Sequence, residues 1–496
     1  MDGTTNGTTN GTTNGTTNGT MNGTLNRTLT SELVYDYPSQ SRQLLERVQN
    51  GGKHQVVPLL KTSVPLNILI VGAGLGGLAT AVALARRGHA VTVLEQAAVL
   101  GEVGAGIQIP PNSARLLLSW GIGPFFEGRV VEPESMTFRR WEDGSAIGFT
   151  KLKPNFSETY GAPYFVIHRA DFHDALCKLA AQHGVKVITN SKVVEYDESL
   201  PLAKTQDGRE FTADLIIAAD GVKSVARPTV IGGTDIPASK TGFAAYRAVV
   251  ETEKMKADPE TSWLLEKPGI NIWIGEGRHV MTYCIAGGKS FNMVLSHVDH
   301  SDAATWKPEN AVDDMRKHFE NWDSKLFKVI DLITKTIKWP LLSGAHLPTW
   351  ISKSQKLVIL GDAAHAMVPY MSQGAAMAVE DGAALAEALS HIVSKQQVPD
   401  ALRVFEKERM KRSYGMQSAS LVNGKLWHFP DGKEQQARDA GARAEVEGKY
   451  FVESTNQWSD PVTQLWTYGY DAEKELKKTW TFENGLSNGG NPNHKI

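Results

Sequence analysis

The sequence predicts an α/β fold in which a parallel sheet with flanking helices carries an inserted antiparallel β-sheet. Three observations predict it. The first part of the chain alternates apolar strand-like runs, glycine turns and helices, which is typical of βαβ units. A middle part of short runs rich in β-branched and aromatic residues follows. Another apolar strand and a long helix come after this middle part. The last strand of the parallel sheet is therefore expected there, followed by a helical C-terminal region.

Composition excludes several classes of protein. The 496 residues are 41% hydrophobic and 21% charged, enough for a large core, and the net charge is −2. This balance provides no basic field, so we expect no nucleic-acid partner. Cys177 and Cys284 are the two cysteines of the chain, too few for a disulfide framework, and His168 and His173 have no third ligand at metal-binding spacing. We therefore expect no metal and, since few thiols fit a reducing compartment, a cytoplasmic location.

The first residues have low complexity. Residues 1–35 consist mostly of Asn, Gly and Thr in a period of four, and so polar a segment cannot offset its ordering entropy, which predicts a disordered tail. Its Asn-x-Thr triplets would accept sugars only in a secreted protein, and the tail contains no stretch like a signal peptide. Residues 36–64 predict a linker with a short amphipathic helix around Ser39–Gln49.

The uncharged stretch from Leu66 to Ala85 is long enough to be mistaken for a membrane span. Its spacing indicates something else: a strand over Asn67–Val71, a turn with four glycines over residues 72–77, and a helix over Leu78–Arg87. A strand, a turn and a helix account for the glycines and a span does not. We therefore expect no transmembrane segment.

Residues 72–77 match G-x-G-x-x-G, and each glycine has a mechanical reason. Gly72 permits the tight turn, Gly74 lets a pyrophosphate approach the backbone, and Gly77 lets the helix pack closely on the strand. The helix N-terminus then presents N–H groups and a positive dipole end to the phosphates. A second strand, Ala90–Leu94, ends at Glu95, which is placed to bind an adenosine ribose. The pattern predicts a dinucleotide and does not by itself separate FAD from NAD.

Two more acidic motifs follow apolar strands. Asp214–Ala218 is followed by Asp220-Gly221, and Leu357–Leu360 is followed by Gly361-Asp362. Acids at the carboxyl ends of strands in an open α/β sheet lie where a cofactor crosses the crevice. Gly374 begins a long helix, whose N–H groups would point at the electron-rich end of a flavin ring.

The middle of the chain predicts a substrate-binding sheet over the flavin, with strands at Gly242–Val250, Asn271–Ile274, His279–Ile285 and Phe291–His297. Strand alternation places Arg247 and Tyr283 on the flavin side, with Tyr246 opposite. Arg247 can bind a carboxylate or stabilise a phenolate, and Tyr283 can donate to or exchange a proton with the same oxygen. The alternative makes Arg247 a surface ion-pair residue and Tyr283 a packing aromatic. His365 is expected to be structural rather than a catalytic base.

The sequence resembles the single-component FAD-dependent aromatic hydroxylases, the group that includes p-hydroxybenzoate and salicylate hydroxylases. The resemblance runs from about residue 65 to 475 and is closest to the fungal salicylate hydroxylase-like branch. It implies a Rossmann-like FAD-binding domain, an inserted antiparallel substrate domain and a helical C-terminal region. The motifs that carry it are residues 72–77 with Glu95, 104–112, 168–172, Asp220-Gly221, Gly361-Asp362, 429–432 and 456–461.

The resemblance also implies contacts to FAD. Glu95 is expected at the adenosine ribose, Arg169 at the pyrophosphate or ribose, and Asp362 between ribityl chain and pyrophosphate. Asp220 with Gly221 is expected to support both FAD and NAD(P)H. NADH and NADPH are not distinguished, because no second glycine fingerprint follows a strand. The residues expected beside the flavin are Gly106, Gln108, Gly374 and Ala375.

The activity that the resemblance implies is an NAD(P)H- and O2-dependent monooxygenase that hydroxylates a phenolic or electron-rich aromatic substrate through a flavin C4a-hydroperoxide. A place in fungal secondary metabolism is an association with that branch. The same chemistry could instead give oxidative dearomatisation, indole epoxidation or decarboxylative hydroxylation. Two alternatives from other classes stay open: a flavin dehydrogenase or reductase that never uses oxygen, and a non-catalytic nucleotide-binding protein. The oligomeric state is also open, with a homodimer as one candidate.

The expected domain organisation follows from these segments. The tail (1–35) and linker (36–64) precede the first part of the FAD-binding domain (65–240), the β-rich substrate domain (241–345), the second part of the FAD-binding domain with its long helix (346–425) and a C-terminal segment (426–496).

Overall fold

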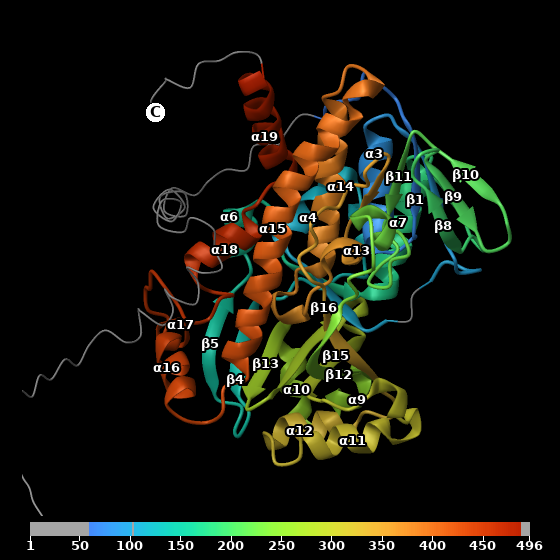
Figure 1. Ribbon diagram of the computed structural model, residues 1–496. Coiled ribbons are helices and arrows are strands. Elements are labelled where there is room, and N and C mark those ends of the chain that lie inside the picture. The colour runs from blue at the N-terminus through green and yellow to red at the C-terminus, as the bar shows by residue number, and fades with distance from the viewer. Residues whose placement is uncertain (1–58, 102–103, 488–496) are drawn as a thin grey trace, which may run out of the picture.

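The computed structural model describes residues 59–101 and 104–487, with side chains as far as residue 483. The expectations for residues 1–35 and for a helix around Ser39–Gln49 lie outside the described residues. Figure 1 shows two halves, an upper one built on a parallel sheet and a lower one built on a mainly antiparallel sheet. Helix α15 (Val398–Trp427) runs alongside both.

The parallel sheet has five strands in the order β17-β11-β1-β2-β7. The apolar runs of β17, β11, β1 and β2 are buried in the principal core, and the partly buried Val187 and Ile188 of β7 pack against it. Val71 pairs with both Leu94 and Ala218, and Ala218 pairs with Ile359, so the strands end level. The residues that follow these ends therefore meet at one edge of the sheet. The strands are β1 (Asn67–Val71), β2 (Ala90–Leu94), β7 (Lys186–Ile188), β11 (Leu215–Ala218) and β17 (Leu357–Ile359).

Helix α3 (Leu75–Arg86) follows β1 after the glycine turn and packs against both α7 (Arg169–Gln182) and α14 (Gly374–Ser390). Alanine is the most frequent residue of α3 and α14, and both helices contain glycines. At Gly382 there is no room for a side chain, because a Cβ there would lie 2.7 Å from the Thr80 Cα. These small residues let the two helices approach closely. The stretch 66–85 is thus a strand, a turn and a helix, as predicted, although the helix begins at Leu75, three residues earlier than expected. Within 59–101 and 104–487 no helix is long and apolar enough to cross a bilayer.

Smaller elements complete the upper half. A two-stranded ribbon pairs β3 with β6, and a three-stranded sheet in the order β10-β9-β8 projects from one side. The strands are β3 (Gly106–Ile109), β6 (Phe165–His168), β8 (Val193–Asp197), β9 (Leu202–Thr205) and β10 (Glu210–Thr212), and the helices are α4 (Pro111–Trp120), α5 (Gly123–Phe126), α6 (Asn155–Tyr160), α8 (Arg227–Ile231) and α13 (Asp362–His365).

The lower half is a seven-stranded sheet in the order β16-β12-β15-β14-β13-β4-β5. The four strands expected in the middle of the chain are all present in it. Two further strands come from residues that sequence analysis assigned to the FAD-binding part, and one of them, β4, pairs with β13 in parallel. The strands are β4 (Ser135–Arg140), β5 (Ala146–Lys151), β12 (Ser239–Glu251), β13 (Gly269–Gly275), β14 (Arg278–Ile285), β15 (Ser290–Val298) and β16 (Ile337–Ser343).

In Figure 1, helices α9 to α12 lie below the lower sheet, and the C-terminal helices α16 to α19 lie along the left-hand side of the molecule. A separate hydrophobic core lies between the lower sheet and the outer helices. Tyr246 is fully buried in this core, on the face of the sheet opposite to Arg247, as strand alternation predicted. The helices are α9 (Thr252–Lys256), α10 (Pro259–Glu266), α11 (Ala311–His318), α12 (Ser324–Asp331), α16 (Lys433–Gly441), α17 (Arg443–Val446), α18 (Pro461–Tyr468) and α19 (Ala472–Ser487).

A buried ionic network joins α14 to α15. Glu380 and Asp381 of α14 are both 0% exposed, as is Arg409 of α15. The Arg409 guanidinium donates to Glu380 Oε2 at 2.8 Å and to Asp381 Oδ1 at 2.9 Å. Arg412 adds a bond to Glu380 Oε1 at 3.1 Å. Burial opposes the ionisation of Asp381, but His365 and Arg409 outweigh it and lower the pKa of this carboxyl.

The same carboxylates reach the segments that surround the sheet edge. Asp381 Oδ2 accepts from the Gly361 N–H at 3.0 Å and from His365 Nε2 at 2.6 Å. Glu380 Oε1 accepts from Asn112 at the start of α4, at 2.7 Å. Asn112 also donates to Gln373, the N-cap of α14, at 2.9 Å. His365 is therefore structural, as expected, and the network fixes the N-terminus of α14 against three other segments.

We predict that Arg409→Met destabilises the protein by about 3–5 kcal/mol, because it removes the cation that bridges two buried carboxylates and leaves them only Arg412 and His365 as ion-pair partners. Urea unfolding followed by tryptophan fluorescence measures this. Arg403→Ala is the matched control on the same helix, since Arg403 pairs with Asp400 and its side chain is 62% exposed; we expect a loss of less than about 1 kcal/mol. Equal losses for the two variants would contradict a central role for the network.

Candidate active site

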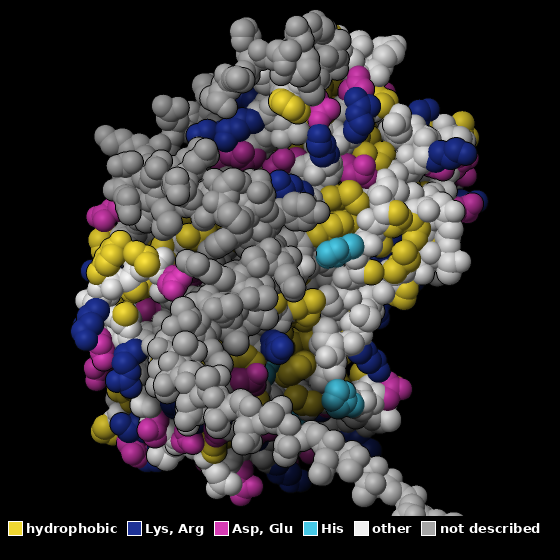
Figure 2. Space-filling model, turned by 60° about the vertical axis from the view of Figure 1, so that its left-hand side comes forward, with side chains coloured by type: hydrophobic (Ala, Val, Ile, Leu, Met, Phe, Trp, Pro, Cys, Tyr) yellow, Lys and Arg dark blue, Asp and Glu magenta, His cyan; other side chains and the backbone are white. Residues whose placement is uncertain are grey.

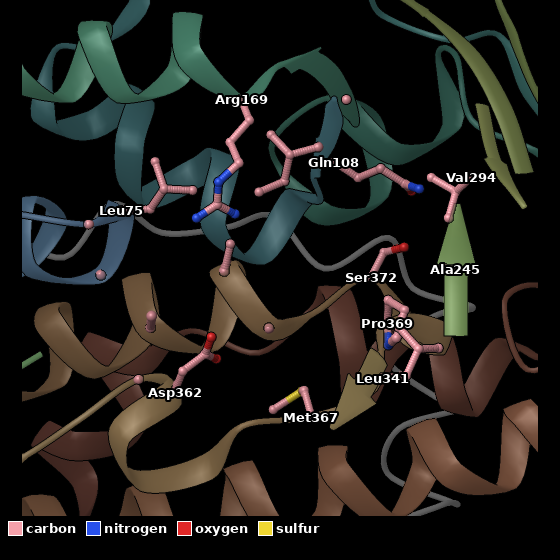
Figure 3. A pocket seen from close by; sticks show the side chains of 18 of the residues that line it. Leu75, Gln108, Arg169, Ala245, Val294, Leu341, Asp362, Met367, Pro369 and Ser372 are labelled. Carbon is pink, nitrogen blue, oxygen red and sulfur yellow. The ribbon is translucent and has the colours of Figure 1, made fainter. Parts of the chain in front are cut away.

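One cavity of about 340 Å³ lies between the edge of the parallel sheet and the lower sheet. Its walls come from segments far apart in the sequence. The residues predicted as sites that line it are Gly74, Gly106, Gln108, Arg169, Arg247, Tyr283, Asp362, Gly374 and Ala375. In Figure 3, Leu75, Arg169 and Asp362 lie toward one end, and Ala245, Val294 and Leu341 lie toward the other.

The glycine turn forms the first wall. Gly72 has φ +103°, and a Cβ there would lie 2.4 Å from the Ala219 carbonyl oxygen, while a Cβ on Gly77 would lie 2.0 Å from the Gly72 oxygen. These two glycines therefore shape the turn itself and do not line the cavity. Gly74 differs, because its φ of −69° suits any residue and a Cβ would meet nothing within 4 Å. The space beside Gly74 is thus left open on the cavity side.

Two helices begin at the cavity without a capping side chain. In the described residues, the N-caps of α3 and α14 are Gly74 and Gln373, neither makes a side-chain capping bond, and neither first turn carries an acid. Their free N–H groups and dipole ends make this part of the cavity favourable to negative charge. Figure 3 shows Arg169 and Asp362 extending into the same space from opposite sides.

Two predicted acids lie beside the cavity rather than in its wall. Glu95 follows β2, and its oxygens accept the N–H groups of Ala73 and Ala97, each at 2.8 Å. Asp220 accepts from the Val225 N–H at 2.8 Å, and its other oxygen is buried without a partner in the described chain. Burial raises the pKa of Asp220. Both carboxylates fix the loops next to the sheet edge, and their expected contacts to a cofactor stay predictions.

The residues fit a dinucleotide of the FAD type. Two observations support this fit: the opening beside Gly74, which only a glycine leaves free, and the two helix N-termini at the cavity that no side chain caps. A pyrophosphate would be stabilised by these N–H groups and by Arg169. Gly374 and Ala375 would place the N-terminus of α14 against a flavin ring.

The far end of the cavity combines one cation with apolar side chains. Arg247 lines it from β12, and among the described residues no carboxylate pairs with its guanidinium, whose Nε is buried without a hydrogen bond. Tyr283 lines it from β14 and is 3% exposed. Burial raises the pKa of Tyr283, although the charge of Arg247 opposes the shift, so the phenol stays protonated. The apolar lining consists of Ala245, Met281, Val294, Leu341, Met367 and Trp427.

Gln108 connects the ribbon β3-β6 to the lower sheet. Its Oε1 accepts from the Tyr164 hydroxyl at 2.5 Å, and its Nε2 lies 2.9 Å from the sulfur of Met281. Gly106 on the same strand donates its N–H to Asn292 at 2.6 Å. A Cβ at Gly106 would lie 2.4 Å from the Tyr283 ring, so this glycine lets the ribbon lie directly on β14.

Several residues that line the cavity or hold its lining residues in place were not predicted. Asn292, Tyr164 and Met281 act through cross-strand or long-range contacts, and no local pattern in the sequence marks them. His279 also lines the cavity and carried a weak signal, since it stands four residues before Tyr283 and therefore on the same strand face. Glu380 and Asp381 are also buried, and two adjacent acids in a helical stretch of the sequence do not reveal this.

Comparison with known families gives a match to the FAD binding domain family over residues 65–420. The chain belongs to this family. The predicted resemblance, the fold class and FAD as the cofactor are thereby confirmed. Three curated relatives, 32–34% identical over 82–84% of this chain, are named FAD-dependent monooxygenases, which confirms the predicted enzyme class.

Curated relatives of this FAD-dependent monooxygenase cover most of its length. The FAD-dependent monooxygenase OpS4 of Beauveria bassiana is 34% identical over 415 residues, which is 82% of this chain and 96% of that protein. The 3-hydroxybenzoate 6-hydroxylase of Polaromonas naphthalenivorans is 34% identical over 416 residues, 83% of this chain and 98% of that protein.

Solved structures have the same fold. FqzB superposes with a TM-score of 0.72 at 27% identity, covering 88% of this chain and 99% of that one. A salicylate hydroxylase in complex with its substrate gives a TM-score of 0.67 at 25% identity, covering 84% of this chain and 98% of that one.

The surface carries charges of both signs. On the face in Figure 2, the basic and acidic side chains are interspersed rather than gathered by sign, which agrees with the net charge of −2. In the part of the chain that the structure describes, no three His, Cys, Asp or Glu residues are grouped to hold a metal ion.

We predict that Gly74→Ala lowers the affinity for FAD by tenfold or more while the apoprotein keeps its melting temperature. The added methyl group meets no protein atom and would occupy the space of the cofactor. Gly77→Ala is the matched control, because its Cβ would overlap the Gly72 oxygen, and overpacking costs about 1–3 kcal/mol. FAD fluorescence titration and calorimetry of both apoproteins separate the two effects. Full FAD affinity in Gly74→Ala would contradict the assignment.

Proposed function

We propose that this monooxygenase hydroxylates a small phenolic aromatic acid, with NADH or NADPH as the electron donor and O2 as the oxygen source. The observation that carries the proposal is Arg247, a cation at the far end of the cavity that has no carboxylate partner among the described residues. The guanidinium of this half-buried arginine stays charged at neutral pH, so its site favours an anionic ligand. The names of the 3-hydroxybenzoate and salicylate hydroxylases support this substrate class.

The wall around Arg247 suits the ring of such a substrate. Met281, Val294 and Leu341 offer an apolar surface, and Tyr283 keeps its proton and can donate to an oxygen that Arg247 also contacts. Arg247 would hold a carboxylate in a bidentate manner or lower the pKa of a phenol by favouring its anion. An ionised phenol is the better nucleophile toward an electrophilic oxygen.

FAD supplies the electron transfer and the activation of O2 when it is bound. The residues of this chain bind and orient it: the glycine turn with Arg169 at the pyrophosphate, Asp362 at the ribityl side, and Gly374 with Ala375 at the ring. Glu95 at the adenosine ribose and Asp220 as a support for both FAD and NAD(P)H belong to the same proposal. The apolar side chains at the far end of the cavity would limit the access of water to the reacting atoms.

Cellular context is also proposed. Similarity to fungal monooxygenases of Beauveria bassiana and Arthrinium supports a place in fungal secondary metabolism. The small number of thiols supports the cytoplasm.

A panel of phenolic acids and natural-product phenols tests the proposal with the FAD-loaded enzyme. We expect at least one phenolic acid to accelerate NAD(P)H oxidation and to gain one oxygen atom. Loss of carbon dioxide with the gain of oxygen would identify decarboxylative hydroxylation, and dearomatised or epoxidised products would identify the other outcomes. Turnover of an electron acceptor without oxygenated product would contradict the proposal and indicate a dehydrogenase or reductase.

We predict that Arg247→Ala retains FAD and lowers hydroxylation of the active phenolic acid roughly 100-fold, the order found for removing one charge-stabilising group. Product mass and flavin absorbance measure both quantities. Arg247→Lys keeps the charge but not the planar fork and should recover part of the rate.

Lys240→Ala on the same strand is the matched control, since Lys240 is 59% exposed and pairs with Asp302 at the surface. Its hydroxylation rate should equal that of the wild type. Normal hydroxylation by Arg247→Ala would contradict the role given to Arg247.

A further inference from the structure

The cavity-facing side of the lower sheet continues beyond the cavity as an exposed apolar surface. Trp339 and Ile337 of β16 are 51% and 40% exposed, and Val249 of β12 is 40% exposed. We call these three residues the edge stripe, because β16 is the outermost strand and, among the described residues, pairs with β12 alone. Single exposed apolar residues are common on proteins, but a contiguous group of them beside a cavity is typical of a binding surface.

Strand alternation places the edge stripe on the same face of the sheet as the cavity lining. Leu341 of β16 lines the cavity, so Trp339 and Ile337, at alternate positions before it, face the same way. Lys338, between them, faces the other way, since its Nζ lies 5.3 Å from the centre of the Tyr246 ring in the core behind the sheet. The stripe is therefore a continuation of the cavity wall and not part of the back of the sheet.

The strand register places the edge stripe directly beside Arg247. Ile337 lies opposite Arg247 in the β12–β16 pair. Trp339 lies opposite Ala245, which lines the cavity. Val249 comes after Arg247 on the same face of β12. Opposed side chains of an antiparallel pair have their Cβ atoms about 5 Å apart, so a group that extends past an anion bound at Arg247 reaches the stripe at once.

The position of the cation decides what kind of ligand would cover the edge stripe. A compact phenolic acid held at Arg247 would leave the stripe in water. An aliphatic chain attached to the ring next to the anionic group would pass from Arg247 over Ile337 and Trp339, and removal of apolar surface from water stabilises such a complex. In Figure 3, Ala245 and Leu341 lie at the end of the cavity from which the chain would leave.

We propose that the edge stripe is an outer subsite of the active site, which binds an apolar chain carried by the aromatic substrate next to its anionic group. The substrate class is then a phenolic acid with an aliphatic chain ortho to its carboxylate. A chain of several carbons is long enough to cross the roughly 4.8 Å between neighbouring strands. Arg247 orients the charged group, and Ile337 with Trp339 determines the preference for the chain. This inference rests on the proposed function, because it needs a phenolic acid at Arg247.

The probes are 2-hydroxybenzoate and 2-hydroxy-6-pentylbenzoate, which differ only in an aliphatic chain beside the carboxylate. Titration calorimetry with the FAD-loaded enzyme gives the two dissociation constants. We expect the wild type to bind the pentyl compound at least tenfold more tightly, because the chain loses its contact with water. The isomer 2-hydroxy-4-pentylbenzoate, whose chain leaves the opposite side of the ring, should gain less than twofold over 2-hydroxybenzoate.

The double variant Ile337→Ser with Trp339→Ser removes the apolar surface of β16 without changing a buried side chain. We expect its affinities for 2-hydroxybenzoate and 2-hydroxy-6-pentylbenzoate to differ by less than twofold. Tyr450→Ser is the matched control, since Tyr450 is an aromatic residue that is 83% exposed and lies outside the cavity wall. This control should keep the tenfold preference of the wild type.

The outcomes separate the subsite from the proposed function. Equal affinity of the wild type for the two acids, or an equal gain from the 4-pentyl isomer, would overturn the subsite and leave the proposed function standing. A double variant that keeps the preference would also overturn it, and a changed sedimentation coefficient of that variant would then identify the stripe as an interface between copies of this chain. Binding of neither acid would overturn the proposed function, and the subsite with it.

Discussion

The buried ion pairs between Arg409 and the adjacent carboxylates of α14 are the constraint on which the cavity depends. Two charges side by side in a core are tolerated only because the guanidinium groups of Arg409 and Arg412 compensate them. The carboxylates then use their remaining lone pairs to hold the Gly361 N–H and the side chain of Asn112. The N-terminus of α14 is thus held in register with the sheet edge, and a binding site made of four separate segments becomes rigid.

The cavity divides into two electrostatic parts. Near the parallel sheet, helix N-termini and Arg169 favour a phosphate-bearing cofactor, and the opening beside Gly74 leaves room for it. Near the lower sheet, one cation stands among apolar side chains, with a protonated tyrosine beside it. Such an arrangement suits an aromatic anion, whose ring lies against the apolar side chains and whose charged group contacts the cation. A few polar contacts are then enough to orient it. In the proposed reaction, this chain contributes the binding and orientation of the reactants rather than a covalent step on one of its own side chains.

Local patterns predicted the backbone at the parallel-sheet end of the cavity well, because a short sequence determines that geometry. Gly72 and Gly74 form the turn, Gly374 begins α14, and the strands end where the apolar runs end. At the lower-sheet end, the positions of Arg247 and Tyr283 in the cavity wall were predicted because alternation along one strand suffices for them. The joining of β4 to β13, the contact of Asn292 with Gly106 and the pairing of His279 with His428 depend on segments 130 or more residues apart, which no local period records.

We propose that FAD and an aromatic ring meet in this one cavity and that oxygen passes from O2 to the ring. Turnover of a phenolic acid under ¹⁸O2 tests this proposal. We expect a product that carries one ¹⁸O atom for each molecule formed, with NAD(P)H consumed in step. A product without the label, or turnover that continues unchanged without O2, would contradict it.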